Sequence, residues 1–124
     1  MITGSHILLY SKNSDADRSF LRDVLGFPSV DAGRGWLIFK LPPAEIAVHP
    51  AEAGSGGSAF LQAGFYLMCD DLAAQMKALE AKNVHCTAVH TERWGIVTTI
   101  QLPSGGEIGL YQPTHPTAFD LASK

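Results

Sequence analysis

Two glutamates, Glu45 and Glu107, stand at equivalent places in the sequence and have side chains that can move protons or bind a ligand. Residues 41–50 read LPPAEIAVHP, and residues 102–113 read LPSGGEIGLYQP, so the second segment repeats the first with one residue inserted before the glutamate and one before the final proline. The same repeat pairs His49 with Tyr111. A partly desolvated glutamate has a raised pKa and can shuttle protons, whereas a glutamate at a solvated rim is idle. The repeat leaves both interpretations open.

The elements that must position these residues are duplicated as well. In each half the hydrophobic pattern predicts a strand, an amphipathic helix and three further strands, which is an α+β arrangement of two tandem βαβββ modules. The first helix is expected after Ser14, with Gly26 ending it, and the second after Asp71. Strands are expected near residues 5–11, 28–32, 36–41 and 45–49, and again near 65–69, 85–89, 97–102 and 107–111.

The chain has 124 residues, the size of one ordinary domain. Within it we expect module one at about 3–53 and module two at about 59–113, followed by a tail over 114–124. The glycine- and serine-rich residues 54–58 form the expected joint between the modules.

Composition argues against several classes of protein. The net charge is −3 with scattered Lys and Arg, so nucleic acid is not an expected partner. Apolar runs are far shorter than the ~20 residues of a spanning helix, so no membrane association is expected. The only cysteines, Cys69 and Cys86, show no C-x-x-C spacing and fit reduced thiols in the cytoplasm.

The opening of the chain resembles a known superfamily. His6-Ile7-Leu8-Leu9-Tyr10, followed by DRSFLRDVLGF at 17–27, is similar to the start of vicinal oxygen chelate proteins, which include glyoxalases, bleomycin resistance proteins and extradiol dioxygenases. The resemblance continues through Asp70-Asp71 and the segment 103–111. It implies that the two modules form an open eight-stranded cup around a small-molecule cavity, in a homodimer.

The resemblance also implies where a metal would bind, because metal enzymes of this superfamily carry ligands on the first and last strands of each module. The corresponding residues are His6, Ala47, Gly64 and Gly109, of which only His6 has a donor side chain. We therefore expect no metal and no other cofactor. The alternative is a displaced zinc, iron or manganese site made by His6, Glu45, His49 and Glu107.

The face of the expected cup follows from strand alternation, since residues two apart point to the same side. Polar and aromatic residues on that face are typical of an organic-ligand site. Before the long strand of module two, Arg93 could bind an anionic group and Trp94 could stack on a ring, or Trp94 could anchor a core or an interface. The expected ligand-binding residues are His6, Leu8, Tyr10, His49, Tyr66, Met68, Arg93, Trp94 and Tyr111, whereas His85, His90 and His115 carry little weight.

These observations favour a protein that binds a small aromatic or amphipathic organic molecule without a metal, as the superfamily's drug-sequestering resistance proteins do. The alternative is an enzyme, either a metal-dependent lyase or dioxygenase or a metal-free isomerase. Its candidate catalytic residues are His6, Glu45 and Glu107. In a third interpretation the cup is filled by side chains and the protein acts through its dimer surface.

Overall fold

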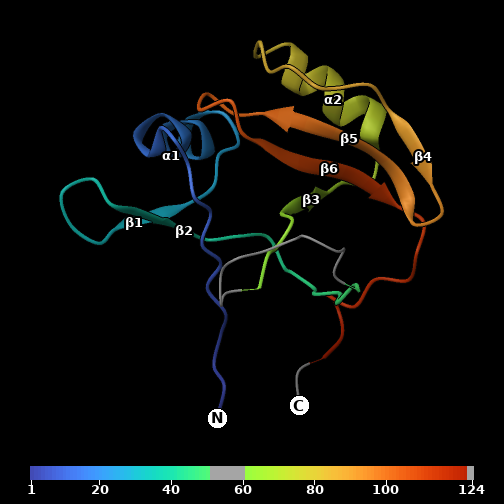
Figure 1. Ribbon diagram of the computed structural model, residues 1–124, viewed down its shortest axis with the longest axis horizontal. Helices are drawn as coiled ribbons and strands as arrows, with labels where there is room; N and C mark the ends of the chain where they lie inside the picture. The colour runs from blue at the N-terminus through green and yellow to red at the C-terminus, as the bar shows by residue number, and fades with distance from the viewer. Residues whose placement is uncertain (51–60, 123–124) are drawn as a thin grey trace. The chain divides into compact units, whose positions relative to one another are not determined.

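The structure is a computed structural model of the chain, and it describes residues 1–50 and 61–122. Its α+β architecture, as expected, has two helices and six strands among the described residues (Figure 1). They form two compact units: unit 1 holds residues 1–39 with 102–106, and unit 2 holds 40–101 with 107–124. The elements are α1 (Ser14–Asp23), β1 (Ser29–Asp31), β2 (Leu37–Phe39), β3 (Tyr66–Met68), α2 (Leu72–Glu80), β4 (His90–Glu92), β5 (Gly95–Gln101) and β6 (Glu107–Pro113).

Helix α1 of unit 1 lies where the sequence predicts it. Asn13, one residue before the expected cap, accepts a hydrogen bond from the backbone N–H of Ala16 at 3.2 Å. Asp15 and Asp17 stand in the first turn, where the helix dipole favours negative charge. The helix ends at Asp23 with Val24 as its C-cap, two residues before the expected Gly26, whose φ of 73° is a conformation that favours glycine.

The β1–β2 hairpin of unit 1 is held by its turn. Val30 pairs with Ile38 in an antiparallel register. The carboxylate of Asp31 accepts hydrogen bonds from the backbone N–H groups of Gly33, at 2.7 Å, and Gly35. Arg18 of α1 places its guanidinium 4.6 Å from the ring centre of Trp36. Of the two tryptophans of the chain, Trp36 therefore has its contact within unit 1.

Unit 2 contains a four-stranded sheet in the order β3-β6-β5-β4. β3 runs parallel to β6, and the other two pairs are antiparallel. Helix α2 lies against one face of this sheet (Figure 1). Asp71 caps it as predicted by accepting from Ala74 N–H at 3.0 Å. The buried core of this unit is formed by Leu72, Leu79, Val84, Thr98, Ile100, Ile108, Leu110 and Tyr111.

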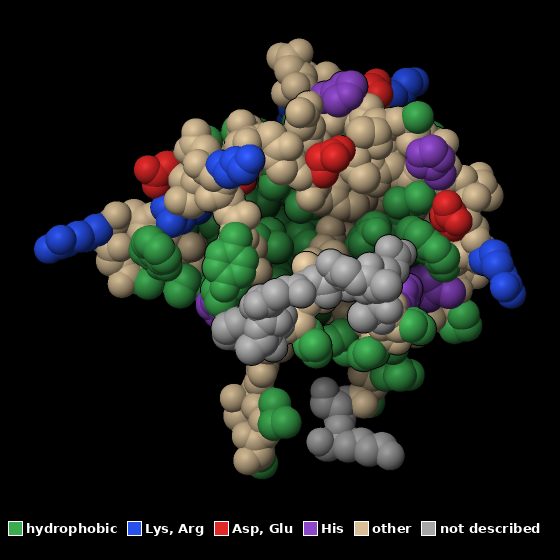
Figure 2. Space-filling view, viewed as in Figure 1, with side chains coloured by type: hydrophobic (Ala, Val, Ile, Leu, Met, Phe, Trp, Pro, Cys, Tyr) green, Lys and Arg blue, Asp and Glu red, His purple; other side chains and the backbone are tan. Residues whose placement is uncertain are grey.

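Two expected strands are absent from the described residues: segments 5–11 and 45–49 have no strand structure and appear as irregular chain in Figure 1. A strand forms only where a neighbour pairs its backbone, and neither segment has such a neighbour among residues 1–50 and 61–122. Their side chains are open to solvent, with Ile46 and Val48 90% and 88% exposed. Hydrophobic side chains are accordingly visible at the surface in Figure 2. The described residues therefore form six strands in two sheets and not clearly the expected eight-stranded cup.

Smaller differences concern module two and the joint. The strand expected at 85–89 is reduced to one bridge between Cys86 and Ile100, and regular pairing begins only at His90. The expected joint at residues 54–58 lies outside the described residues. The module boundaries therefore stay predictions. Within 1–50 and 61–122, no helix is long and apolar enough to cross a membrane.

Candidate functional site

Three aromatic residues of unit 2 form the candidate site. The rings of Tyr66, Trp94 and Tyr111 meet edge to face, with centroids 6.0 Å apart for Tyr66–Trp94, 5.9 Å for Tyr66–Tyr111 and 5.1 Å for Trp94–Tyr111. Such geometry matches the positive ring edge with the negative ring face. Tyr111 is buried at the centre, whereas Tyr66 and Trp94 remain 49% and 36% exposed. We call these three residues the aromatic cluster.

Strand register brings two of these rings together. Tyr66 of β3 pairs with Gly109 of β6, and Met68 pairs with Tyr111. Because successive residues alternate between faces, Tyr66 and Tyr111 project from the same side of the sheet. The opposite side carries Ile108 and Leu110, which are buried in the core. The alternation in the sequence predicted this division correctly.

Trp94 is positioned by a tight hairpin. Arg93 and Trp94 are the two turn residues between β4 and β5, since Glu92 pairs with Gly95. The residue after β6, Thr114, holds this turn: its N–H donates to the carbonyl of Trp94 at 3.0 Å, and its hydroxyl donates to the carbonyl of Arg93 at 3.1 Å. The turn and the end of β6 are thereby fixed to one another, which keeps Trp94 beside Tyr111.

Glu45 and His115 extend the aromatic cluster with polar groups. His115 stacks on Tyr111 with centroids 5.9 Å apart, and its Nε2 lies 3.0 Å from the Tyr111 hydroxyl. Glu45 places Oε2 3.8 Å from the same nitrogen. Its other carboxylate oxygen accepts a hydrogen bond from the backbone N–H of Ala118 at 2.8 Å. This hydrogen bond connects the tail after β6 to the irregular segment that contains Glu45.

The hydrogen bonds of His115 define its tautomer. Its Nδ1 lies 2.7 Å from the carbonyl oxygen of Pro116, which can only accept, so Nδ1 carries a proton. In the neutral ring Nε2 then accepts the hydrogen bond from the Tyr111 hydroxyl. Burial raises the pKa of Tyr111, and the charges of Glu45 and Tyr66 raise it further. The hydroxyl thus keeps its proton at neutral pH.

Of the residues predicted from the sequence, the structure brings four together: Glu45, Tyr66, Trp94 and Tyr111. Met68 is adjacent on β3 and half-buried. Glu107 is exposed, and its carboxylate accepts a hydrogen bond from the Thr99 hydroxyl at 2.7 Å instead of joining the cluster. The remaining predicted residues are exposed in unit 1 (His6, Leu8 and Tyr10) or in unit 2 (His49 and Arg93).

His115 is the site residue that sequence reasoning missed. It follows the last strand and has no periodic pattern around it, so nothing local indicates that it faces Tyr111. The available signal is its flanking prolines, Pro113 and Pro116, which restrict the backbone where the chain leaves the sheet.

Among the described residues, no group of three or more His, Cys, Asp or Glu side chains could hold a metal ion. His6 belongs to unit 1, whereas Glu45, His49 and Glu107 belong to unit 2, so a displaced site made by these four residues stays a prediction. The positions at which the resemblance places ligands are no better suited. Ala47, Gly64 and Gly109 have no donor side chain.

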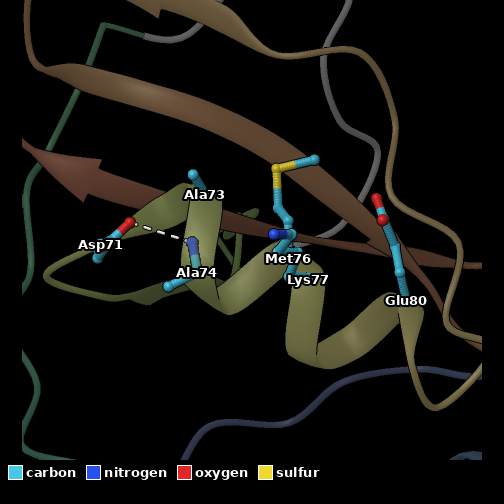
Figure 3. Close-up of a pocket in the computed structure, with 6 residues that line it drawn as sticks. All are labelled: Asp71, Ala73, Ala74, Met76, Lys77 and Glu80. Atoms are coloured by element: carbon cyan, nitrogen blue, oxygen red, sulfur yellow. Dashed lines mark hydrogen bonds between the residues drawn. The ribbon is translucent and has the colours of Figure 1, made fainter.

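A separate hollow of about 540 Å³ lies along α2 and is open to solvent (Figure 3). It contains none of the predicted site residues. Its lining comes from this one helix, and one of its residues, Asp71, already caps the helix through Ala74. The lining residues are Asp71, Ala73, Ala74, Met76, Lys77 and Glu80.

Comparison with solved structures shows similarity over most of the chain. TnmS3, an antibiotic binding protein from Streptomyces sp. CB03234, is 23% identical and superimposes with a TM-score of 0.61, covering 92% of this chain and 100% of that one. Lactoylglutathione lyase from Agrobacterium tumefaciens is 23% identical, with a TM-score of 0.59 and coverage of 89% and 92%. A glyoxalase/bleomycin resistance protein from Streptomyces sp. CB03234 is 22% identical, with a TM-score of 0.55 and coverage of 82% and 93%. No protein-family model and no curated protein matches the chain.

Proposed function

We propose that this chain, which has the fold of the glyoxalase/bleomycin resistance proteins, binds a small aromatic or amphipathic organic molecule at the aromatic cluster of unit 2. The observation that carries the proposal is the partial exposure of two cluster rings, Tyr66 and Trp94, around a buried third. Exposed aromatic surface beside a few polar groups is typical of an organic-ligand site. The antibiotic binding by the similar protein TnmS3 agrees with this use of the fold.

The polar groups beside the rings would orient the ligand. Glu45 supplies a carboxylate whose side chain is 21% exposed, and His115 supplies an imidazole that is 26% exposed. Rings provide most of the contact area, while these groups discriminate among ligands by hydrogen bonding. The site needs no metal for this function.

Binding is tested with 2-naphthol as a probe, measured by isothermal titration calorimetry. Trp94→Leu removes one exposed ring of the cluster, and Trp36→Leu is the matched control because that ring lies in unit 1 against Arg18. We expect the Trp94 variant to bind at least about threefold more weakly, from the lost ring contacts, with the control unchanged. Equal affinity of both variants for the probe would contradict this location for the site.

A second candidate function is proton-transfer catalysis, favoured by the Tyr111–His115–Glu45 contacts. His115 Nε2 is an acceptor beside the Tyr111 hydroxyl, and a carboxylate lies next to both. A metal-free isomerase needs such an acid–base pair. Turnover of a bound carbonyl compound that falls sharply in His115→Gln would favour the enzyme over the binding protein.

We also propose that the expected cup is completed in a homodimer. By the internal repeat, residues 8–10 correspond to strand β3 and residues 46–48 to residues 108–110 of β6, and in these strands Leu67 pairs with Leu110. The equivalent Leu9 and Val48 are exposed in the single chain. Pairing with a second copy would bury them. A dimer by light scattering, with slow amide exchange in both segments, is the expected result; a monomer would overturn it.

The cytoplasm is the proposed location. Both cysteines in the described part of the chain are free thiols, which suits a reducing compartment.

A further inference from the structure

The ring of Tyr66 occupies the space beside Gly109. A Cβ atom added to Gly109 would overlap three carbons of that ring, the farthest of them, Cγ, at 2.7 Å. Real Cβ atoms essentially never approach another heavy atom so closely. Any side chain at position 109 and the observed position of the Tyr66 ring therefore exclude each other.

The backbone does not explain this glycine. Gly109 is in the middle of β6, paired with Thr99 on one side and Tyr66 on the other, and it is absent from the residues with positive φ. An alanine would fit such a strand backbone, and glycine within a strand normally weakens it. The space occupied by the Tyr66 ring is the remaining explanation for a glycine at position 109.

A second glycine lies against the same ring. A Cβ on Gly64 would lie 3.2 Å from Cε1 of Tyr66, tighter than most real contacts. Gly64 and Gly109 are also the two module-two positions at which the resemblance places metal ligands. The ring that lies against both glycines belongs to Tyr66, a residue that is 49% exposed.

We infer that Tyr66, seated on Gly64 and Gly109, determines the specificity of the proposed site: its ring fills the space that ligating side chains would need and presents an aromatic face to the ligand. The part of the inference that concerns the ligand rests on the proposed function. The packing of the Tyr66 ring on Gly64 and Gly109 does not depend on it. It assigns the ligand class as planar aromatic molecules that stack on this face, with saturated molecules of the same size bound more weakly.

The packing of the Tyr66 ring against Gly109 is tested without a ligand by a double-mutant cycle with Gly109→Ala and Tyr66→Ala. In the presence of Tyr66 we expect the alanine to lower Tm by at least about 4 °C, because the ring must leave its position. In the Tyr66→Ala background the same substitution should leave Tm unchanged or raise it. Gly106→Ala is the matched control, because a Cβ there meets only the Ser104 hydroxyl, at 3.4 Å. An equal loss of Tm in both backgrounds would contradict the claim that the Tyr66 ring occupies the space beside Gly109.

Specificity is tested with 2-naphthol and its saturated counterpart decahydro-2-naphthol. We expect the unmodified chain to prefer the aromatic probe by about three- to tenfold, and Tyr66→Leu to lower this preference while Trp36→Leu leaves it intact. An unchanged preference in Tyr66→Leu would overturn the inference and leave the proposed function standing. Failure of the unmodified chain to bind 2-naphthol would overturn the proposed function. The Tm measurements would still show whether the Tyr66 ring packs against Gly109.

Discussion

The hydroxyl of Tyr111 lies 3.0 Å from Nε2 of His115, and the two rings stack within 29° of parallel. This contact joins the most buried ring of the aromatic cluster to the tail that follows β6. The phenol acts as the donor, because Nδ1 of His115 holds its proton toward the carbonyl of Pro116. Its environment makes loss of that proton unfavourable.

The first prediction concerns stability at alkaline pH. Burial and the charge of Glu45 raise the pKa of Tyr111, so the folded chain holds the phenolic proton more tightly than the unfolded chain does. The free energy of unfolding should therefore be independent of this group below about pH 10 and fall as pH rises through the folded pKa. Denaturant unfolding of the unmodified chain and Tyr111→Phe between about pH 8 and 12 measures it. The variant should lack this component of the decline, whereas Tyr10→Phe, at an exposed position, should keep it.

The second prediction concerns the tail. Glu45 accepts the N–H of Ala118, 73 positions away in the sequence, so Glu45→Ala should release that amide. A hydrogen bond worth about 1 kcal/mol implies that hydrogen exchange of Ala118 speeds up by about fivefold. Glu45→Gln retains an acceptor and should show less effect. Glu107→Ala, which loses only the contact with Thr99, serves as control. Identical exchange in all three variants would show that the contact does not hold the tail.

The third prediction concerns Asp17 of α1. Its buried carboxylate accepts the Ser11 hydroxyl at 2.6 Å and the Ser104 N–H at 3.0 Å, both within unit 1. Asp17→Ala leaves both donors without this acceptor and should lower the free energy of unfolding by about 1–3 kcal/mol in urea titrations. Asp15→Ala in the same helical turn removes an exposed ion pair with Arg18 and should cost about 0.5 kcal/mol or less. Comparable losses at the two positions would refute the role of Asp17.

The fourth prediction concerns the thiols. Burial raises the pKa of both Cys69 and Cys86, with nearby carboxylates adding to the effect. Since the thiolate is the reactive form, both should react with Ellman's reagent at about pH 8 more slowly than a free thiol, and at the ordinary rate in denaturant. The single variants Cys69→Ser and Cys86→Ser separate the two rates. A native thiol as fast as the free thiol would contradict the raised pKa.

Local signals account for what could be predicted from the sequence. Asp71 and Gly26 mark helix ends because capping depends on a few neighbouring residues. Alternation placed Tyr66 and Tyr111 on one face because side chains in a strand repeat every two residues. The sequence alone shows that Gly64 and Gly109 have no side chain to bind a metal. Only the structure shows that the Tyr66 ring lies beside both of them.

The remaining features depend on partners that are distant in the sequence. Residues 5–11 and 45–49 have strand-like patterns, yet a strand requires a neighbour, and the described part of the chain offers none to either segment. His115 reaches Tyr111 only because the tail turns back after β6 and is held there by Glu45. Neither relationship leaves a periodic trace in the sequence.

The central claim, that the aromatic cluster binds an organic ligand, is tested most directly by an amide and indole NMR titration with 2-naphthol. The two tryptophans provide internal references, since Trp94 belongs to the cluster and Trp36 contacts Arg18 in unit 1. We predict saturable shifts of the Trp94 indole and of the Tyr66 and Tyr111 amides. Shifts confined to Trp36 or to the hollow along α2 at residues 71–80, or no saturable shift at all, would contradict the claim.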